Sequence, residues 1–172
     1  MTTLLLVRHG ETDWNAEGRL QGHTDTPLND YGRRQAGRLA DELAGGAFDA
    51  LYSSDLSRAR ETAEILGGRL GLPVELDPGL REKNWGSWEG LTSTERDAVE
   101  YVGESTAAHR ERTLETLLAI GARHPGGRVL VVTHGGSVRR VQAAASGFAM
   151  PVIDNCSVWA CVLEDDSFRP LD

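Results

Sequence analysis

The hydrophobic residues of this chain follow two patterns, short continuous apolar runs and longer stretches with the period of a helix. The apolar runs predict strands at 4–7, 50–53, 73–76, 128–133 and 157–163. The periodic stretches predict helices at 29–44, 55–70, 107–123 and 137–146. Strands that alternate with helices and are apolar on both faces indicate a parallel sheet covered on both sides. We therefore expect an α/β fold: a three-layer αβα sandwich with a mostly parallel central sheet and helices on both faces.

Composition limits what the protein binds. The 172 residues suit one domain, 1–172, and carry a formal net charge of -8. Such an acidic protein repels other polyanions, so we expect no nucleic-acid partner and no membrane partner. An anionic ligand would need a local cluster of cations. The oligomeric state is left open, with a homodimer as one alternative.

Two features favour a cytoplasmic location. The apolar run at 4–7 is too short for a signal peptide or a membrane span. Cys156 and Cys161 lie five residues apart in a predicted strand, so their side chains should face opposite sides of the sheet. We therefore expect two buried free thiols and no disulfide, which suits a reducing compartment.

Polar residues follow three of the predicted strands directly. The three segments are Arg8-His9-Gly10, Ser53-Ser54-Asp55 and His134-Gly135-Gly136. In parallel sheets, ligands collect at the carboxyl ends of the strands. We therefore expect these three segments to meet at one edge of the sheet.

The two histidines favour a phosphate ligand over a metal. A lone histidine after a strand is more often structural than catalytic. Here Arg8 lies beside His9, and His134 ends a second buried strand. A metal site would want a third ligand at similar depth, and His23 and Asp25 lie in a polar loop without ligand spacing. We therefore expect a phosphate site and no metal.

Two further segments carry candidate groups. Arg58 lies in the first turn of the second helix, where the helix N-terminus favours anions and a guanidinium matches phosphate oxygens. The run 80–90 places Glu82 near Trp85 and Trp88. We interpret this run as a packed loop whose tryptophans fill the core. Such a loop would hold Glu82 in place, as a proton donor requires.

Four motifs occur in order along the chain. They are RHGET at 8–12, SDLSRARETA at 54–63, LREKNWGSWEG at 80–90 and VTHGG at 132–136. Together they resemble the histidine phosphatase superfamily, in its phosphoglycerate mutase-like branch, over about the whole chain. The resemblance implies an enzyme that hydrolyses a small phosphorylated metabolite through a phosphohistidine intermediate, without a metal or another cofactor.

The resemblance also implies a role for individual residues. His9 would be the nucleophile and Glu82 the proton donor to the leaving alcohol. The phosphoryl group would bind Arg8, Arg58, His134 and Asn15. The substrate-side residues would be Gln21, Gly22, Thr24 and Gly135. Asn155 matches a family asparagine near a strand, and the stretch 103–112 resembles one that would bring Arg110 or Arg112 near the substrate.

The chemistry of these groups fits a phosphate monoester, which carries nearly two negative charges. Arg8 and Arg58 nearly balance that charge, and His134 would add more if it were protonated. The nucleophile must be a neutral imidazole, and a backbone carbonyl on its other ring nitrogen would fix the tautomer. An alkoxide is a poor leaving group, so it needs a proton from a positioned general acid.

Two alternatives remain, a phosphoglycerate mutase and a non-catalytic module that binds a phosphate ligand on the same fold. Only 91–132 separates the third motif region from the strand end at His134, and the chain stops soon after the strand 157–163. A short cover favours water access and therefore hydrolysis over mutase transfer. Non-catalytic relatives usually lose the nucleophile or an arginine, and here both are present. The ester is left open among sugar phosphates, phosphoglycerate derivatives, phosphoserine and α-ribazole phosphate.

Overall fold

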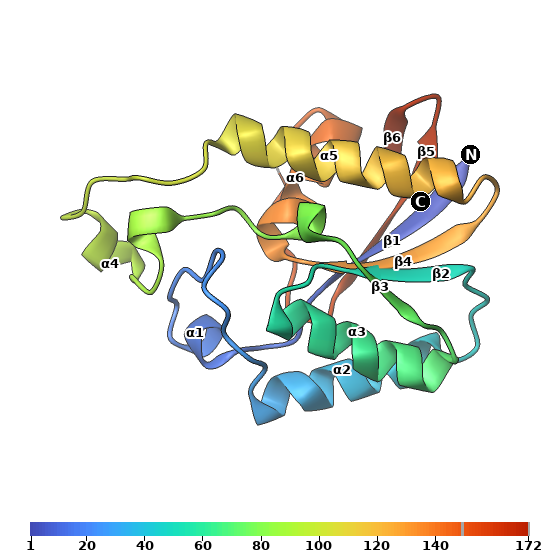
Figure 1. Ribbon diagram of the computed structural model, residues 1–172, viewed down its shortest axis with the longest axis horizontal. Coiled ribbons are helices and arrows are strands. Elements are labelled where there is room, and N and C mark those ends of the chain that lie inside the picture. Colours follow the sequence, from blue (N-terminus) through green and yellow to red (C-terminus); the bar gives the residue numbers. More distant parts are fainter. Residues whose placement is uncertain (149, 172) are drawn as a thin grey trace.

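The computed structural model describes residues 1–148 and 150–171, which contain one six-stranded sheet in the order β3-β2-β4-β1-β5-β6 (Figure 1). The strands are β1 (Thr2–Arg8), β2 (Ala50–Ser53), β3 (Val74–Leu76), β4 (Arg128–Thr133), β5 (Val158–Glu164) and β6 (Ser167–Pro170). The first four strands pair in parallel, while β5 pairs antiparallel with β1, and β6 pairs antiparallel with β5. The mostly parallel sheet is therefore confirmed.

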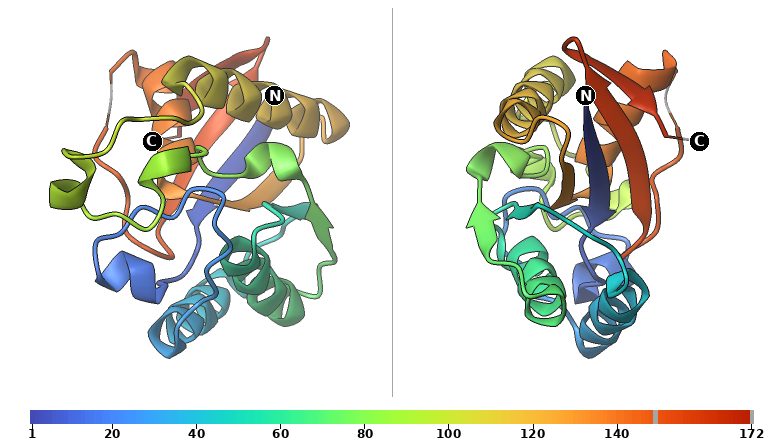
Figure 2. Two further views of the ribbon diagram at one scale, coloured as in Figure 1. Left: turned by 60° about the vertical axis from the view of Figure 1, so that its left-hand side comes forward. Right: turned by 90° about the vertical axis from the view of Figure 1, so that its right-hand side faces the viewer.

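Helices cover both faces of this sheet, as the two views of Figure 2 show. The long helices are α2 (Asp30–Leu43), α3 (Ser57–Leu70), α5 (Thr106–Arg123) and α6 (Gly135–Ser146). The connecting segments carry the short helices α1 (Asp13–Ala16) and α4 (Ser93–Arg96) and the 3-10 turns η1 (Pro78–Leu80) and η2 (Gly86–Trp88). The layers follow from the strands, because successive side chains of a strand face opposite sides. Leu4 and Leu6 pack with α5 and α6, whereas Leu5 and Val7 pack with α2 and α3.

The expected α/β sandwich is confirmed, and each strand and helix predicted from the apolar pattern is present. The differences lie at ends and in short elements. α3 and α6 each begin two residues away from the prediction, and β6, α1, α4 and the two 3-10 turns were not predicted. Elements of three or four residues are too short to show a period. The predicted single domain, 1–172, includes Ala149 and Asp172, which lie outside the described residues, and it stays a prediction.

The two cysteines are free thiols, but only Cys161 is buried and lies in a strand; Cys156 is half-buried, so the prediction of two buried thiols is wrong for it. Cys161 belongs to β5, whereas Cys156 precedes it and has a φ of 56°, which turns the chain. They pack into the two different core layers, so they lie on opposite sides of the sheet as predicted. Between residues 1 and 171, with position 149 left aside, no helix is long and apolar enough to span a membrane.

The order of the central strands places the candidate residues together. β2, β4 and β1 are neighbours and run parallel, so their carboxyl ends lie side by side. The register pairs Arg8 with Thr133, and Ser53 with Val132. The three polar segments that follow these strands therefore leave the sheet at one edge, as the sequence predicts.

Candidate active site

His9 follows β1 directly and is held by its backbone. Its N–H donates to the carbonyl of Thr133 at 3.0 Å, and its carbonyl accepts from Asn155 Nδ2 at 2.9 Å. The ring Nδ1 lies 2.7 Å from the carbonyl oxygen of Gly10. A carbonyl can only accept, so Nδ1 carries the proton. Burial and two nearby arginine charges lower the pKa of His9 well below its usual value, which leaves a neutral ring with an Nε2 lone pair.

Two arginines flank His9, one buried (Arg58) and one half-buried (Arg8), and backbone carbonyls fix both of them. Arg58 donates to the carbonyls of Gly22 at 2.7 Å and Thr24 at 3.1 Å. Arg8 donates to the carbonyl of Ile153 at 2.7 Å. Burial lowers the pKa of Arg58 to about 10, so its guanidinium is still charged at neutral pH. Two positive charges therefore stand beside the imidazole in a desolvated setting.

His134 follows β4 directly, occupies the N-cap position of α6 and is fully buried. Its ring centroid lies 5.2 Å from that of His9, and its Nε2 lies 2.9 Å from Ser54 Oγ. Burial, followed by the charge of Arg58, lowers the pKa of His134 well below its usual value. The ring is therefore neutral, so the idea that His134 adds a positive charge is not supported, because a third cation here would be neither solvated nor paired.

Three buried nitrogens around His9 lack a hydrogen-bond partner in the described part of the chain. They are Nε of Arg8, Nε of Arg58 and Nδ1 of His134. More than nine in ten buried polar groups in proteins are satisfied, so three such groups in one place call for a ligand. Arg8, His9 and Arg58 line the pocket, where an anion would accept from the two guanidinium groups, whereas His134 is fully buried and does not line it. We call Arg8, His9, Arg58 and His134 the histidine end of the site.

Glu82 lies on the opposite side of the pocket, and backbone N–H groups hold its carboxylate. Oε2 accepts from the N–H of Gly136 and Oε1 from the N–H of Lys83, both at 2.8 Å. Glycine at position 136 leaves room for this contact, because an added Cβ would overlap the carboxyl group of Glu82 and displace it. His109 Nε2, which is buried, lies 3.6 Å from Oε1. The carboxyl group is therefore fixed by contacts from three segments of the chain.

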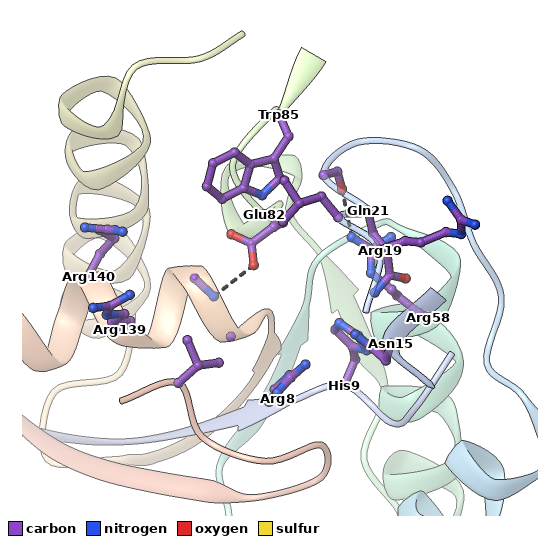
Figure 3. A pocket seen from close by; sticks show the side chains of 15 residues that line it. Arg8, His9, Asn15, Arg19, Gln21, Arg58, Glu82, Trp85, Arg139 and Arg140 are labelled. Carbon is purple, nitrogen blue, oxygen red and sulfur yellow. Dashed lines mark hydrogen bonds between the residues drawn. The ribbon is translucent and has the colours of Figure 1, made fainter. Parts of the chain in front are cut away.

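The pocket between these groups has a volume of about 220 Å³. Figure 3 shows Arg8, His9, Asn15 and Arg58 on one side, with Glu82 and Trp85 facing them and Arg139 and Arg140 beyond Glu82. We call the second group the glutamate end of the site; its members are Glu82, Trp85, Gly136, Arg139 and Arg140. The pocket suits a small molecule with an anionic group at His9.

Comparison with known proteins agrees with this geometry. The family model of the histidine phosphatase superfamily (branch 1) matches residues 4–171. The chain belongs to this superfamily. The family predicted from the four motifs is therefore confirmed.

Similar histidine phosphatase relatives cover most of the chain. A phosphoglycerate mutase-like protein 4 of Arabidopsis thaliana is 40% identical, over 87% of this chain and 73% of the relative. A metal-independent phosphoserine phosphatase of the same plant is 36% identical, over 86% and 72%. Among solved structures, YhfR of Bacillus stearothermophilus superposes with a TM-score of 0.91 at 35% identity and covers 99% of this chain and 95% of its own.

Most of the expected substrate-side residues of this histidine phosphatase line the pocket, but Thr24 does not. Gln21, Gly22 and Gly135 are in the lining, as is Asn15, which the family resemblance gives as a phosphoryl-binding residue. Thr24 is exposed, and its hydroxyl and N–H both donate to Glu89. The expectation for Thr24 is therefore wrong for its side chain, because Glu89 fixes the loop from outside, although its carbonyl does hold Arg58.

The two tryptophans do not fill the core, contrary to the prediction. Trp85 and Trp88 are half-buried and stack on each other with ring centroids 6.3 Å apart, and Tyr101 packs against both. Lys83 Nζ lies 4.3 Å from the centroid of the Trp85 ring. The core under this loop is already filled by Leu80 and by α5, so the rings form a separate cluster over the pocket.

Arg110 and Arg112 do not line the pocket either. Arg110 is exposed, and Arg112 pairs with Glu104 at 2.9 Å and donates to the carbonyls of Gly79 and Arg81. Arg112 therefore holds the loop that carries the proton-donor candidate. The pocket lining also contains residues that the sequence did not predict as site residues, namely Arg19, Leu20, Trp85, Gly136, Arg139, Arg140 and Val152. The signal for two of them was present, because Arg139 and Arg140 lie within two turns of a helix that opens at His134.

Proposed function

We propose that this protein hydrolyses a small phosphate monoester through a phosphohistidine on His9. One observation carries the proposal: the neutral His9 ring, with its free Nε2, lines the same pocket as the guanidinium groups of Arg8 and Arg58. A phosphoryl group placed there would satisfy these donors and face the nucleophile. Charge-assisted hydrogen bonds of this kind supply much of the catalysis of phosphoryl transfer.

The first step of the proposed reaction transfers the phosphoryl group to the protein. The Nε2 lone pair of His9 attacks phosphorus, the bond from phosphorus to the ester oxygen breaks, and Glu82 gives its proton to the leaving alcohol. Asn15 lines the same wall, and its Oδ1 accepts from Asn155 at 3.3 Å. Its amide group is thereby turned so that Nδ2 can donate to a phosphoryl oxygen.

The second step returns the protein to its starting state. Water attacks the phosphohistidine, Glu82 takes the proton from the water, and the bond from phosphorus to Nε2 breaks. Inorganic phosphate leaves, and His9 is neutral again. Every proton in this cycle moves through Glu82, so the cycle needs neither a metal nor a nucleotide. The name of the metal-independent phosphoserine phosphatase relative supports that part of the proposal.

The proposal is tested with p-nitrophenyl phosphate in the presence and absence of EDTA. We expect turnover that EDTA leaves unchanged, together with an acid-labile phosphoenzyme that appears in rapid-quench samples. No turnover between pH 5 and 8 would favour a non-catalytic phosphate-binding module. Turnover that EDTA abolishes would contradict the metal-free cycle.

A mutase is the second candidate, because one relative is named phosphoglycerate mutase-like. A mutase must return the phosphoryl group to its substrate before water reaches it. The side chain of Glu82 is 14% exposed, so water has access to the glutamate end of the pocket, which favours hydrolysis. Phosphorus NMR of 3-phosphoglycerate decides between the two. Conversion to 2-phosphoglycerate faster than release of phosphate would make the protein a mutase.

The proposal also includes the partner and the compartment. A pocket of about 220 Å³ suits a small phosphorylated metabolite. Two thiols without a disulfide support a reducing compartment such as the cytoplasm.

A further inference from the structure

The glutamate end carries two arginines that the proposed reaction does not use. Arg139 and Arg140 are half-buried on α6 and line the same pocket as His9. Within residues 1–148 and 150–171, neither forms an ion pair with a carboxylate, and Nε of each is buried without a partner. Arg19, the other unassigned arginine of the pocket, differs because Glu17 pairs with it at 2.7 Å.

The carboxylates near the two arginines contact other groups. Glu82 is held by the N–H groups of Lys83 and Gly136, and Glu104 pairs with Arg112. Lys83 adds a further positive charge nearby, and burial together with the charge of Arg140 lowers its pKa. Two unpaired guanidinium groups on one pocket wall offer hydrogen-bond donors and positive charge to an anion. In a chain of net charge -8, this concentration of positive charge is local.

The proposed reaction fixes where a substrate would reach these arginines. The phosphoryl group lies at the histidine end, and its ester oxygen must face Glu82 to receive a proton. The rest of the alcohol then continues beyond Glu82. Figure 3 shows Arg139 and Arg140 on α6, to the left of Glu82, at the end of the pocket away from His9. The second pair of arginines therefore lies where the far end of the alcohol would be.

We propose that Arg139 and Arg140 form a second anion subsite, and that the substrate is a phosphate monoester whose alcohol part carries a second acidic group. This inference rests on the proposed function, because the reaction sets the direction of the ester. A carboxylate or a second phosphate would satisfy the same guanidinium groups. The small pocket restricts the spacing of the two acidic groups to a few bonds.

The test compares three esters that share one scaffold. Glycerol 3-phosphate has no second acidic group, 3-phosphoglycerate replaces its terminal alcohol by a carboxylate, and glycerol 1,3-bisphosphate adds a second phosphate. We expect kcat/KM for phosphate release to be roughly 10- to 100-fold higher for at least one acidic ester than for glycerol 3-phosphate. The preferred acidic ester then shows whether the second acidic group is a carboxylate or a phosphate. Equal values for all three esters would overturn the proposal.

Variants then assign the preference to the two arginines. In R139Q/R140Q the preference should fall to within about threefold, whereas R139K/R140K should keep much of it because the charges remain. R110Q is the matched control, since Arg110 is exposed on α5 and away from the pocket, and it should match the wild type. Thermal melts check that each variant folds. A preference that survives in folded R139Q/R140Q would place the subsite elsewhere and overturn the assignment.

A binding measurement separates this inference from the proposed reaction. In the His9→Ala protein, calorimetry of 3-phosphoglycerate, glycerol 1,3-bisphosphate and glycerol 3-phosphate reports affinity without turnover. Tighter binding of an acidic ester, lost in His9→Ala/R139Q/R140Q, supports the subsite even if the wild type proved inactive. Equal affinities for all three esters would overturn the subsite while an active wild type still supported the phosphatase.

Discussion

The two ends of the pocket are built in different ways. The histidine end comes from the sheet edge: Arg8 is the last residue of β1, His9 comes next, Arg58 lies in the first turn of α3 and His134 follows β4. Parallel strand register fixes these positions, and backbone carbonyls hold both arginines. The glutamate end comes from a loop and one helix face, and its side chains are half-buried. The first end is therefore suited to a constant chemical step, and the second to recognising one particular alcohol.

The two ends also differ in which of their groups carry charge. At the histidine end, burial lowers the pKa of both ring systems, so the rings are neutral and the arginines supply the charge. At the glutamate end, a carboxylate and two unpaired arginines share one wall. Changes at the histidine end should therefore affect every ester alike. Changes at the glutamate end should depend on the alcohol that leaves.

The largest effect is expected from His9→Ala, which removes the nucleophile. Turnover of every ester should fall on the order of 10⁴-fold or more, and the phosphoenzyme should vanish with it. Rapid-quench trapping of the phosphoenzyme and steady-state rates on two esters measure this. His124→Ala is the control, because His124 lies at the end of α5, against Tyr52 and away from the pocket. A His9→Ala protein that still forms a phosphoenzyme would assign the nucleophile elsewhere.

The next effect, from Glu82→Gln, should depend on the leaving group. Hydrolysis of glycerol 3-phosphate should slow by roughly 10² to 10⁴, because the alkoxide no longer receives a proton. Hydrolysis of p-nitrophenyl phosphate should slow far less, because p-nitrophenolate leaves without one. The measurement is kcat for each ester in both proteins. An equal fall in kcat on the two esters would contradict a role for Glu82 as proton donor to the leaving alcohol.

A smaller effect is expected from Gly136→Ala, which tests how rigidly the carboxyl group is held. The added Cβ would overlap Glu82 and push its carboxylate away from the N–H that fixes it. We expect roughly tenfold slower hydrolysis of glycerol 3-phosphate and less change with p-nitrophenyl phosphate. Gly37→Ala is the matched helix variant, because nothing lies within 4 Å of its added Cβ. It should keep full activity and gain about 0.5–1 kcal/mol of stability.

The same contrast explains what the sequence could predict. Arg8, His9 and His134 follow the apolar runs of β1 and β4, so the local pattern of the sequence predicts where these strands end. The position of the site then follows from three strand ends at one edge of the sheet. The glutamate end depends on contacts between distant segments. Arg112 holds the carbonyl of Arg81 across 31 positions, and no local pattern encodes such a contact.

Two errors have the same origin. The run 80–90 predicts a packed loop with Trp85 and Trp88 in the core, and the structure places both rings outside it. Whether a ring enters the core depends on the space left by α5 and Leu80, which is a property of the packed molecule. Thr24 fits the family's substrate-side loop in sequence, yet Glu89, 65 positions away, takes its hydroxyl. Local patterns predicted the elements, and long-range contacts decided which side chains face the ligand.

The smallest effect is a pH dependence of stability that should differ between the two ends. His9 and His134 at the histidine end, and His109 under Glu82, are buried, and burial is the main cause that lowers the pKa of each. In the unfolded chain a histidine titrates near 6.5. As the pH falls through that value, the unfolded chain binds protons that the folded protein does not, so the free energy of unfolding decreases.

Thermal melts between pH 5.5 and 7.5 measure this loss, because most carboxyl groups remain ionised there. We expect a Tm that is several degrees lower at pH 5.5 than at pH 7.5. His109→Gln and His9→Gln should each flatten the slope. Glu82 favours a charged His109, whereas two arginines oppose a charged His9, so the flattening by His9→Gln should extend to lower pH. Identical slopes of Tm against pH in the wild type and both variants would show that neither His9 nor His109 is kept unprotonated by the folded protein.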